Sequence, residues 1–341
     1  MLIKTTQEYA NHGMPLECDI YAADDSPSDA PIFLYFHPGG LVNWGRDCVP
    51  PWLVQICFKR KWPLISFSYR LFPQTTSKGL LEDAKAAHAF ARRYQTPEGQ
   101  SRRVIVGGGS GGVFPATLIV HNCEPPPLAL FSIQGINTFR HPHYTSSTLI
   151  SPEPIRDEDM AEAIAGPLTV GVSVPGADNV FRMDMLRRAD ASRNPDYSYD
   201  EAEEQQPPPP RNPRSGMYEY YTHRNAWPGM VGDVDVGFAW AREEEKEEEE
   251  RGTAEARRAR VARWPPTVIF HGDADVAVPL ALSEQMRDCL GEDKVSLFVA
   301  PGQEHLYDLT RFIEDPAPEM DVVRQAVARL DEIVVQASRT Q

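Results

Sequence analysis

The sequence predicts an α/β fold, in which a mostly parallel central sheet is flanked by helices and interrupted by a helical insertion. Three observations support this fold class. Short β-branched or aromatic runs alternate with helix-like segments over residues 31–133, and such alternation is typical of a parallel sheet with right-handed crossovers. The alternation stops near residue 138 and resumes near residue 264. A glycine-rich turn at 107–112 joins a predicted strand to a predicted helix.

The first half of the chain contains most of the predicted sheet. Residues 2–9 and 15–22 are two predicted strands, and the turn Asn11-His12-Gly13 joins them as a hairpin. The apolar run 31–37 is a predicted buried strand. The elements expected next are a helix over 49–60, a strand over 63–70, a helix over 78–95, a strand over 104–106, a helix over 113–120 and a strand over 128–133.

The second half of the chain completes the sheet after an insertion. The elements expected there are a strand over 266–271, a helix over 279–290, a strand over 295–299 and an amphipathic helix over 319–337. The predicted domains are therefore a core of residues 1–137 and 264–341 and an inserted cap of residues 138–263. Loops at the carboxyl ends of the strands form the site in such folds, so we expect the cap to lie over it as a lid.

The cap contains helix-like pieces near 157–165 and 178–191 and several biased segments. The proline run 207–210 is typical of a stiff linker. The acidic run 243–250 and the basic run 257–260 favour a solvated helix with oppositely charged halves, or a disordered loop. The tyrosines of the cap either line a pocket or pack in the ordinary way; they are Tyr218, Tyr220 and Tyr221.

Composition narrows the classes of partner and compartment. The net charge of −15 argues against nucleic acid and anionic membranes as partners. No segment approaches the roughly 20 apolar residues of a membrane span, and the N-terminus does not resemble a signal peptide. An odd number of scattered cysteines indicates free thiols in a reducing compartment, so we expect a cytoplasmic protein; they are Cys18, Cys48, Cys57, Cys123 and Cys289.

The glycine-rich turn is a candidate nucleophile elbow. Gly108-Gly109-Ser110-Gly111-Gly112 fits G-x-S-x-G between a predicted strand and a predicted helix. The amides at the start of that helix can donate to an oxyanion. Two alternatives stay open on this segment alone, a dinucleotide-binding loop and a plain turn, because residues 107–112 also match G-x-G-x-x-G. A P-loop is excluded, because no Lys-Ser or Lys-Thr follows.

A candidate base and a candidate acid follow later strands. His305 comes soon after the last predicted strand, and Asp275 follows the strand before it. An aspartate that accepts a hydrogen bond from one imidazole nitrogen leaves the other nitrogen to accept the serine proton. Asp273 is the rival for the acid role. Taken singly, His305 is typical of a surface residue and Asp275 of a helix start.

Four motifs together resemble a known family. They are His37-Pro38-Gly39-Gly40, Tyr69-Arg70-Leu71-Phe72-Pro73-Gln74 with Asp83 in the following helix, the elbow Gly108–Gly112, and His271-Gly272-x-x-Asp275 with Gly302-x-x-His305. In these motifs the chain resembles the hormone-sensitive-lipase-like esterases of the α/β-hydrolase superfamily, which include arylacetamide-deacetylase-type enzymes. The resemblance covers residues 31–133 and 264–310 and does not extend to 138–263.

The resemblance implies an α/β-hydrolase fold with a catalytic triad of Ser110, Asp275 and His305. It also implies that the oxyanion is held by the backbone N–H groups of Gly39, Gly40 and Gly111. Pro38 stands where the family has a glycine, but the implied donors are the two glycines that follow it. The N-terminal segment is short for this group, so the cap must come mainly from the insertion.

These observations favour a serine hydrolase that cleaves a carboxylic ester of a small molecule through an acyl-enzyme on Ser110. The alternative is a biosynthetic enzyme on the same fold that performs acyl transfer or a non-hydrolytic lyase or condensation step. A binding protein derived from an inactive hydrolase is disfavoured, because all three triad residues are present. No cofactor and no metal are expected, since His141-Pro142-His143 lacks a third ligand. The oligomeric state is not predicted.

Overall fold

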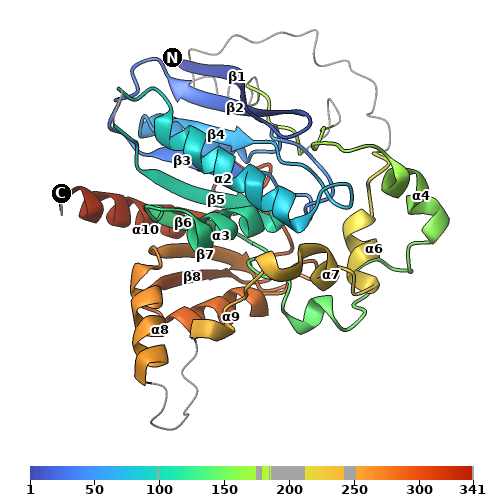
Figure 1. Ribbon diagram of the computed structural model, residues 1–341. Helices are drawn as coiled ribbons and strands as arrows, with labels where there is room; N and C mark the ends of the chain where they lie inside the picture. Colours follow the sequence, from blue (N-terminus) through green and yellow to red (C-terminus); the bar gives the residue numbers. More distant parts are fainter. Residues whose placement is uncertain (98–99, 174–178, 184, 186–211, 242–250, 340–341) are drawn as a thin grey trace.

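A computed structural model describes residues 1–97, 100–173, 179–183, 185, 212–241 and 251–339. Its centre is an eight-stranded sheet with the order β1-β2-β4-β3-β5-β6-β7-β8 (Figure 1). The strands are β1 (Leu2–Asn11), β2 (Pro15–Ala23), β3 (Ile32–Phe36), β4 (Leu64–Phe67), β5 (Val104–Gly109), β6 (Ala129–Ile133), β7 (Thr267–Gly272) and β8 (Val295–Ala300). β1 and β2 are antiparallel, β2 pairs antiparallel with β4, and every other neighbouring pair is parallel. The predicted mostly parallel sheet is confirmed.

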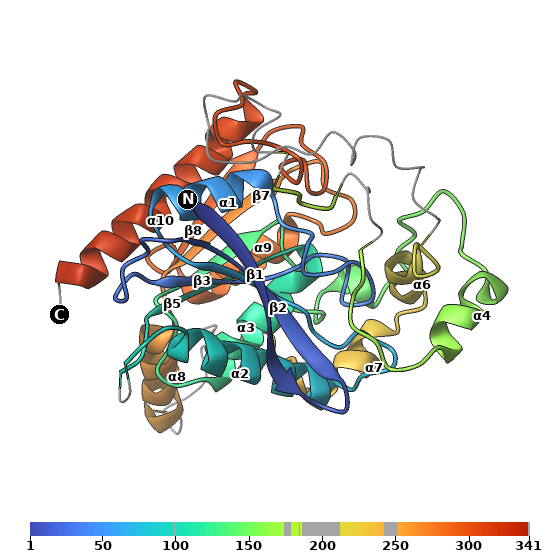
Figure 2. The same ribbon diagram turned by 90° about the horizontal axis from the view of Figure 1, so that it is seen from above.

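Helices cover both faces of the sheet. Figure 2 shows α1 and α10 on one face and α2 and α3 on the other. The helices of the sheet layers are α1 (Pro51–Lys59), α2 (Ser77–Arg93), α3 (Val113–Asn122), α9 (Ala281–Leu290) and α10 (Glu319–Arg339). Buried side chains of α2, α3 and α9 belong to one core cluster, and those of α1 and α10 belong to a second. The two clusters are the two faces of one sheet.

β3 illustrates why the sheet is buried on both sides. Ile32, Leu34 and Phe36 belong to one core cluster, whereas Phe33 and Tyr35 belong to the other. This alternation follows from the period of two in a strand, and a strand covered on both faces is apolar throughout. Each such buried side chain stabilises the fold by about 1.5–3 kcal/mol.

The strand predicted before α2 ends three residues earlier than expected. The expected strand over 63–70 stops at Phe67, because the chain then turns away to Asp83 of α2, which accepts a hydrogen bond from the Arg70 N–H at 2.9 Å. α2 itself begins after Thr76, whose hydroxyl caps it by accepting the Gly79 N–H at 3.0 Å.

The described part of the insertion lies in two places. α4 (Asp157–Ala165), α6 (Met217–His223) and α7 (Trp227–Val231) lie beyond the carboxyl ends of the parallel strands, whereas α8 (Arg251–Arg263) leads into β7 at the other end (Figure 1). The helix expected near 157–165 is confirmed as α4, and the basic run 257–260 lies in α8. The proline run 207–210, the acidic run 243–250 and most of the helix expected over 178–191 fall outside the described residues. The division into core and cap stays a prediction.

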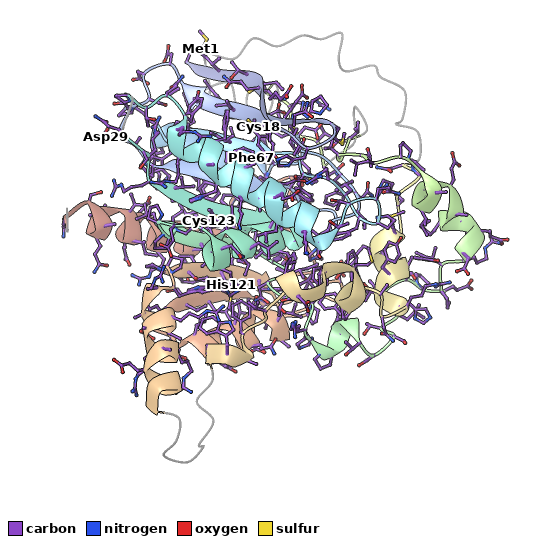
Figure 3. The ribbon with its side chains drawn as sticks, in the orientation of Figure 1. Met1, Cys18, Asp29, Phe67, His121 and Cys123 are labelled. Atoms are coloured by element: carbon purple, nitrogen blue, oxygen red, sulfur yellow. The ribbon has the colours of Figure 1, made fainter. Side chains whose placement is uncertain are left out.

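The cysteines lie on separate elements. All five are free thiols; Cys18 lies on β2, and Cys123 follows α3 close to His121 (Figure 3). Among the described residues, no helix is both long enough and apolar enough to cross a bilayer.

Candidate active site

Ser110 lies on the turn between β5 and α3. Its φ of +50° is left-handed, a conformation that costs a non-glycine residue roughly 1–2 kcal/mol. The turn can close only because its neighbours lack side chains: a Cβ on Gly108 would lie 2.3 Å from the Gly112 carbonyl, and a Cβ on Gly112 would lie 2.1 Å from the Phe36 oxygen. The sequence therefore folds into the strained strand–turn–helix geometry of a nucleophile elbow.

The structure brings the three predicted triad residues together. The Nε2 atom of His305 lies 2.9 Å from the Ser110 Oγ, and its Nδ1 lies 2.5 Å from an Asp275 oxygen. Ser110 follows β5, Asp275 follows β7 and His305 follows β8, and these parallel strands end at the same edge of the sheet. Because the ionised Asp275 only accepts, Nδ1 carries the proton and Nε2 of neutral His305 accepts from the Ser110 hydroxyl.

Asp275 is held in its ionised form. Burial by itself raises its pKa, but hydrogen bonds from His271 and His305 outweigh burial and bring the pKa to about 2. The backbone N–H groups of Ala277 and Val278 also donate to it, at 2.9 and 2.8 Å. The rival Asp273 has a different partner: it accepts the Gly302 N–H at 2.6 Å and thereby ties the loop after β7 to the loop after β8.

The predicted oxyanion glycines lie beside the serine. A Cβ on Gly111 would lie 2.8 Å from the Gly40 nitrogen, so the two backbones are in contact. Gly39 and Gly40 have φ values of +106° and +61°, and they line the same cavity as Ser110. Among the described residues, no acceptor receives a hydrogen bond from the Gly40 N–H, which leaves that donor available to a ligand.

His37 and Tyr69 fix the loop that carries Gly39 and Gly40. Burial lowers the pKa of His37 to about 4, so at neutral pH it is uncharged and donates from Nδ1 to the Pro38 carbonyl at 2.7 Å. Its ring stacks on Tyr69 with centroids 4.3 Å apart, and the Tyr69 hydroxyl donates to the His37 carbonyl at 2.9 Å. Pro38 is therefore used as an acceptor, a role that does not need its missing N–H.

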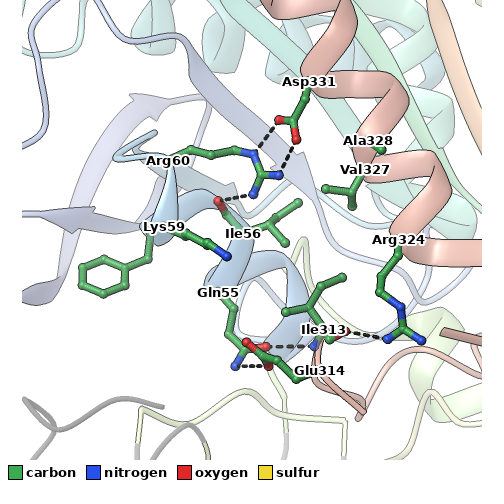
Figure 4. A pocket seen from close by; sticks show the side chains of 11 residues that line it. Gln55, Ile56, Lys59, Arg60, Ile313, Glu314, Arg324, Val327, Ala328 and Asp331 are labelled. Atoms are coloured by element: carbon green, nitrogen blue, oxygen red, sulfur yellow. Dashed lines mark hydrogen bonds and ion pairs between the residues drawn. The ribbon is translucent and has the colours of Figure 1, made fainter. Parts of the chain in front are cut away.

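A cavity of about 230 Å³ opens on the serine. Its lining comes from the glycine loop, the insertion, and the loops of the acid and the base: Gly39, Gly40, Val42, Asn43, Trp44, Ser110, Arg214, Ser215, Gly216, Tyr218, Glu219, Ala277, His305 and Leu306. A larger hollow of about 480 Å³ between α1 and α10 (Figure 4) contains none of the three triad residues.

Comparison with solved structures identifies the fold. A protein of unknown function from Staphylococcus aureus is similar with a TM-score of 0.61 at 18% identity, covering 97% of this chain and 99% of that one. An α/β-hydrolase superfamily protein from Enterococcus faecalis gives 0.63 at 14% identity, covering 97% and 98%. A bacterial heroin esterase gives 0.52 at 15% identity, covering 98% and 83%. The chain has the α/β-hydrolase fold.

Proteins that match in sequence cover a smaller part of this chain than the solved structures do. No family model matches the chain. A probable carboxylesterase of a Phoma species is 25% identical over 148 residues, which is 40% of this chain and 45% of that protein. A non-reducing polyketide synthase of Aspergillus calidoustus is 25% identical over 173 residues, which is 46% of this chain and 7% of that protein. The chain thus spans less than half the length of either curated relative.

Within this α/β-hydrolase fold, one glutamine holds the loop that carries His305. The Gln134 Oε1 accepts the Leu306 N–H at 3.0 Å, and its Nε2 donates to Asp308 at 2.9 Å. Asp308 is fully buried, and the Trp52 indole donates to it at 2.9 Å. Burial raises the pKa of Asp308 to about 6. Sequence reasoning missed both residues; the only signal was the position of Asp308 three residues after His305.

Tyr218 joins the glycine loop to the acid loop. A Cβ on Gly40 would lie 2.6 Å from its ring, and its hydroxyl donates to the Ala277 carbonyl at 2.8 Å. Tyr218 therefore lines the cavity, one of the two alternatives open for the tyrosine patch, whereas Tyr220 and Tyr221 are buried by packing.

The histidine pair considered for metal binding forms a local turn. His141 accepts the backbone N–H of His143 at 3.2 Å through Nδ1. Across the part of the chain that the structure describes, no three His, Cys, Asp or Glu side chains form a group that could hold a metal ion.

Proposed function

We propose that the protein is a serine hydrolase that cleaves a carboxylic ester of a small molecule through an acyl-enzyme on Ser110. The observation that carries the proposal is the continuous chain of hydrogen bonds from Ser110 through His305 to Asp275, at 2.9 and 2.5 Å. This chain is the geometry that activates a serine hydroxyl. The esterases among the structural relatives and the four sequence motifs support membership of the hormone-sensitive-lipase-like group.

The proposed reaction begins with attack by the Ser110 Oγ on the ester carbonyl while the His305 Nε2 takes the hydroxyl proton. The carbonyl oxygen becomes an oxyanion, which the N–H groups of Gly40 and Gly111 stabilise together with that of Gly39. The C–O bond to the alcohol then breaks, and the alcohol leaves with the proton from His305. Asp275 keeps the imidazole in the required tautomer and stabilises the imidazolium.

The second half of the reaction regenerates the enzyme. Water attacks the acyl carbon, His305 accepts its proton and returns it to Ser110 Oγ, and the acid is released. Acyl transfer would follow the same first half, with an acceptor alcohol in place of water. Product analysis therefore separates hydrolysis from the alternative. The free thiols are compatible with the cytoplasmic location that the sequence predicts.

The test compares wild type with Ser110→Ala on p-nitrophenyl esters of increasing acyl chain length. We expect Ser110→Ala to lose turnover, and a fluorophosphonate to add its mass to wild type and not to the variant. Ser296→Ala on β8 is a matched serine control that should keep both properties. The proposal fails if Ser110→Ala turns over an accepted ester as fast as wild type does.

A further inference from the structure

Arg214 places a positive charge in the wall of the cavity that contains Ser110. Its guanidinium is partly buried, and burial lowers its pKa. It donates to the carbonyls of Val42 and Phe72 and, at 3.1 Å, to the side-chain oxygen of Gln74. All three acceptors are neutral. Of the described carboxylates, none forms an ion pair with Arg214.

Three other partly buried arginines are neutralised by aspartates. Arg46 pairs with Asp19 at 2.9 Å, and Arg70 pairs with Asp83 at 2.7 Å. In the hollow between α1 and α10, Arg60 donates two hydrogen bonds to Asp331 at 2.5 Å (Figure 4). A charge removed from water is costly unless it is paired. Arg214 departs from this pattern at the position where a substrate would bind.

Arg102 shows what a purely structural arginine looks like in this fold. It also donates only to carbonyl oxygens, namely those of Pro27, Ala30 and Tyr94. Arg102 holds loops together at the opposite end of the sheet from Ser110 and does not line the cavity. Arg214 combines the same neutral partners with a place in the cavity wall, and this combination is what points to a ligand.

The donors of Arg214 are only partly used. A guanidinium carries five N–H groups, and the bonds to Val42, Phe72 and Gln74 use one on each nitrogen. One N–H therefore remains on each terminal nitrogen. A carboxylate is the group that two such donors bind best, because both bonds are charge-assisted. Glu219 also lines the cavity but does not neutralise Arg214.

We propose that Arg214 binds a carboxylate of the substrate, so that Ser110 acts preferentially on small esters that carry a free carboxylate, such as hemiesters of short dicarboxylic acids. The inference rests on the proposed function and adds the substrate class. The cavity of about 230 Å³ lies below the usual range for drug-sized ligands, which favours small acyl and alcohol groups.

Arg214 has a second effect that the test must separate from recognition. Its bond to Val42 holds the loop that carries Gly39 and Gly40, so its removal can displace the oxyanion donors. That effect lowers turnover of acidic and neutral esters alike. The ratio of kcat/KM for an acidic ester to that for its neutral isostere cancels the shared loss and reports recognition alone.

The experiment uses two isosteric pairs. In the first pair, monoethyl succinate carries the carboxylate on the acyl side, and ethyl 4-methylpentanoate is its neutral isostere. In the second pair, acetoxyacetate carries the carboxylate on the alcohol side, and isobutyl acetate is its neutral isostere. We expect wild type to favour the acidic ester at least tenfold in one pair. Arg214→Gln should abolish that preference, Arg214→Lys should retain part of it, and Arg102→Gln should leave the ratio unchanged. Added salt should weaken the wild-type preference.

Several outcomes would overturn the inference. The first is a wild-type preference for the neutral ester in both pairs, and the second is an Arg214→Gln variant with the same acidic-to-neutral ratio of kcat/KM as wild type. The third is a wild-type ratio that does not change with added salt. This third outcome decides the case if the variants do not fold. Hydrolysis of neutral esters with fluorophosphonate labelling of Ser110 would then leave the proposed function intact. No hydrolysis of any ester together with no labelling would refute the proposed function itself.

Discussion

Gln134→Glu tests whether the brace between the base loop and Asp308 matters for activity. The substituted carboxylate keeps the oxygen that accepts the Leu306 N–H. It replaces the amide donor with a second oxygen 2.9 Å from the Asp308 carboxylate. Two carboxylates this close share one proton, which raises the pKa of the pair. We therefore expect the variant to resemble wild type in acid and to be destabilised in base.

The magnitude follows from the number of protons bound. The pKa of Asp308 in wild type is about 6, so at pH 6 this carboxyl group still holds about half a proton, which it releases by pH 8. The folded variant holds one proton that the unfolded variant lacks. Each such proton lowers the free energy of unfolding by about 1.4 kcal/mol for every unit by which the pH rises. After subtraction of the smaller loss in wild type, the variant should lose about 2 kcal/mol relative to wild type between pH 6 and pH 8.

The assay is urea unfolding from pH 5 to pH 8 with ester hydrolysis measured in parallel. Gln55→Glu is the matched control, because Gln55 also accepts a backbone N–H, that of Ile313 at 2.9 Å, and donates to the carboxylate of Glu314 at 3.1 Å. Gln55 lies in the hollow of Figure 4. We expect its variant to keep kcat/KM, whereas Gln134→Glu should lose kcat/KM relative to wild type as pH rises.

The reasoning on Gln134 is refuted by either of two results. The first is a free-energy difference between variant and wild type that does not change from pH 6 to pH 8. The second is a kcat/KM ratio of variant to wild type that is as insensitive to pH as that of Gln55→Glu. The first result would disprove the shared proton, and the second would show that the brace does not position His305.

Three further predictions concern single groups. Asp275→Asn should lower kcat/KM about 10³–10⁴-fold at pH 7, measured as initial rates per labelled active site; a loss under tenfold would contradict the triad. Gly40→Ala should lower kcat/KM about 10²-fold by displacing an oxyanion donor, because its Cβ would meet the Tyr218 ring. Gly13→Ala is the control, since Gly13 has a φ of +84° with open space around it, and it should retain activity. The raised pKa of Asp308 makes wild type lose about 2 kcal/mol of stability as pH rises from 4 to 6. The Tm of Asp308→Asn minus that of wild type should therefore climb over that range, and a flat difference would refute the raised pKa.

Features with a local cause were accessible from the sequence. The turn around Ser110 follows from glycines that let backbones touch, and the strand runs follow from apolar residues buried on both faces of the sheet. Asp275 and His305 could be placed near Ser110 because strands that run parallel end at one edge. The structure brings their side chains together, and their catalytic roles stay predictions.

Features that depend on distant contacts were not accessible. Gln134 meets Asp308 across 174 residues, and Arg214 meets Val42 across 172. Glutamine and arginine serve so many structural purposes that no spacing singles out these two. The early end of β4 has the same origin, because Arg70 leaves the sheet for a carboxylate thirteen positions further along the chain.

Ser110, Asp275 and His305 follow β5, β7 and β8, and this placement has a consequence for folding. Ser110 and His305 are separated by 195 positions, and His305 follows β8, an edge strand that pairs with β7. Contacts of such long range form late in folding. During refolding, recovery of the proposed ester hydrolysis should therefore lag behind recovery of the far-ultraviolet circular dichroism signal. Ester turnover would then report when the last strands have joined the sheet, whereas circular dichroism would report the earlier formation of secondary structure.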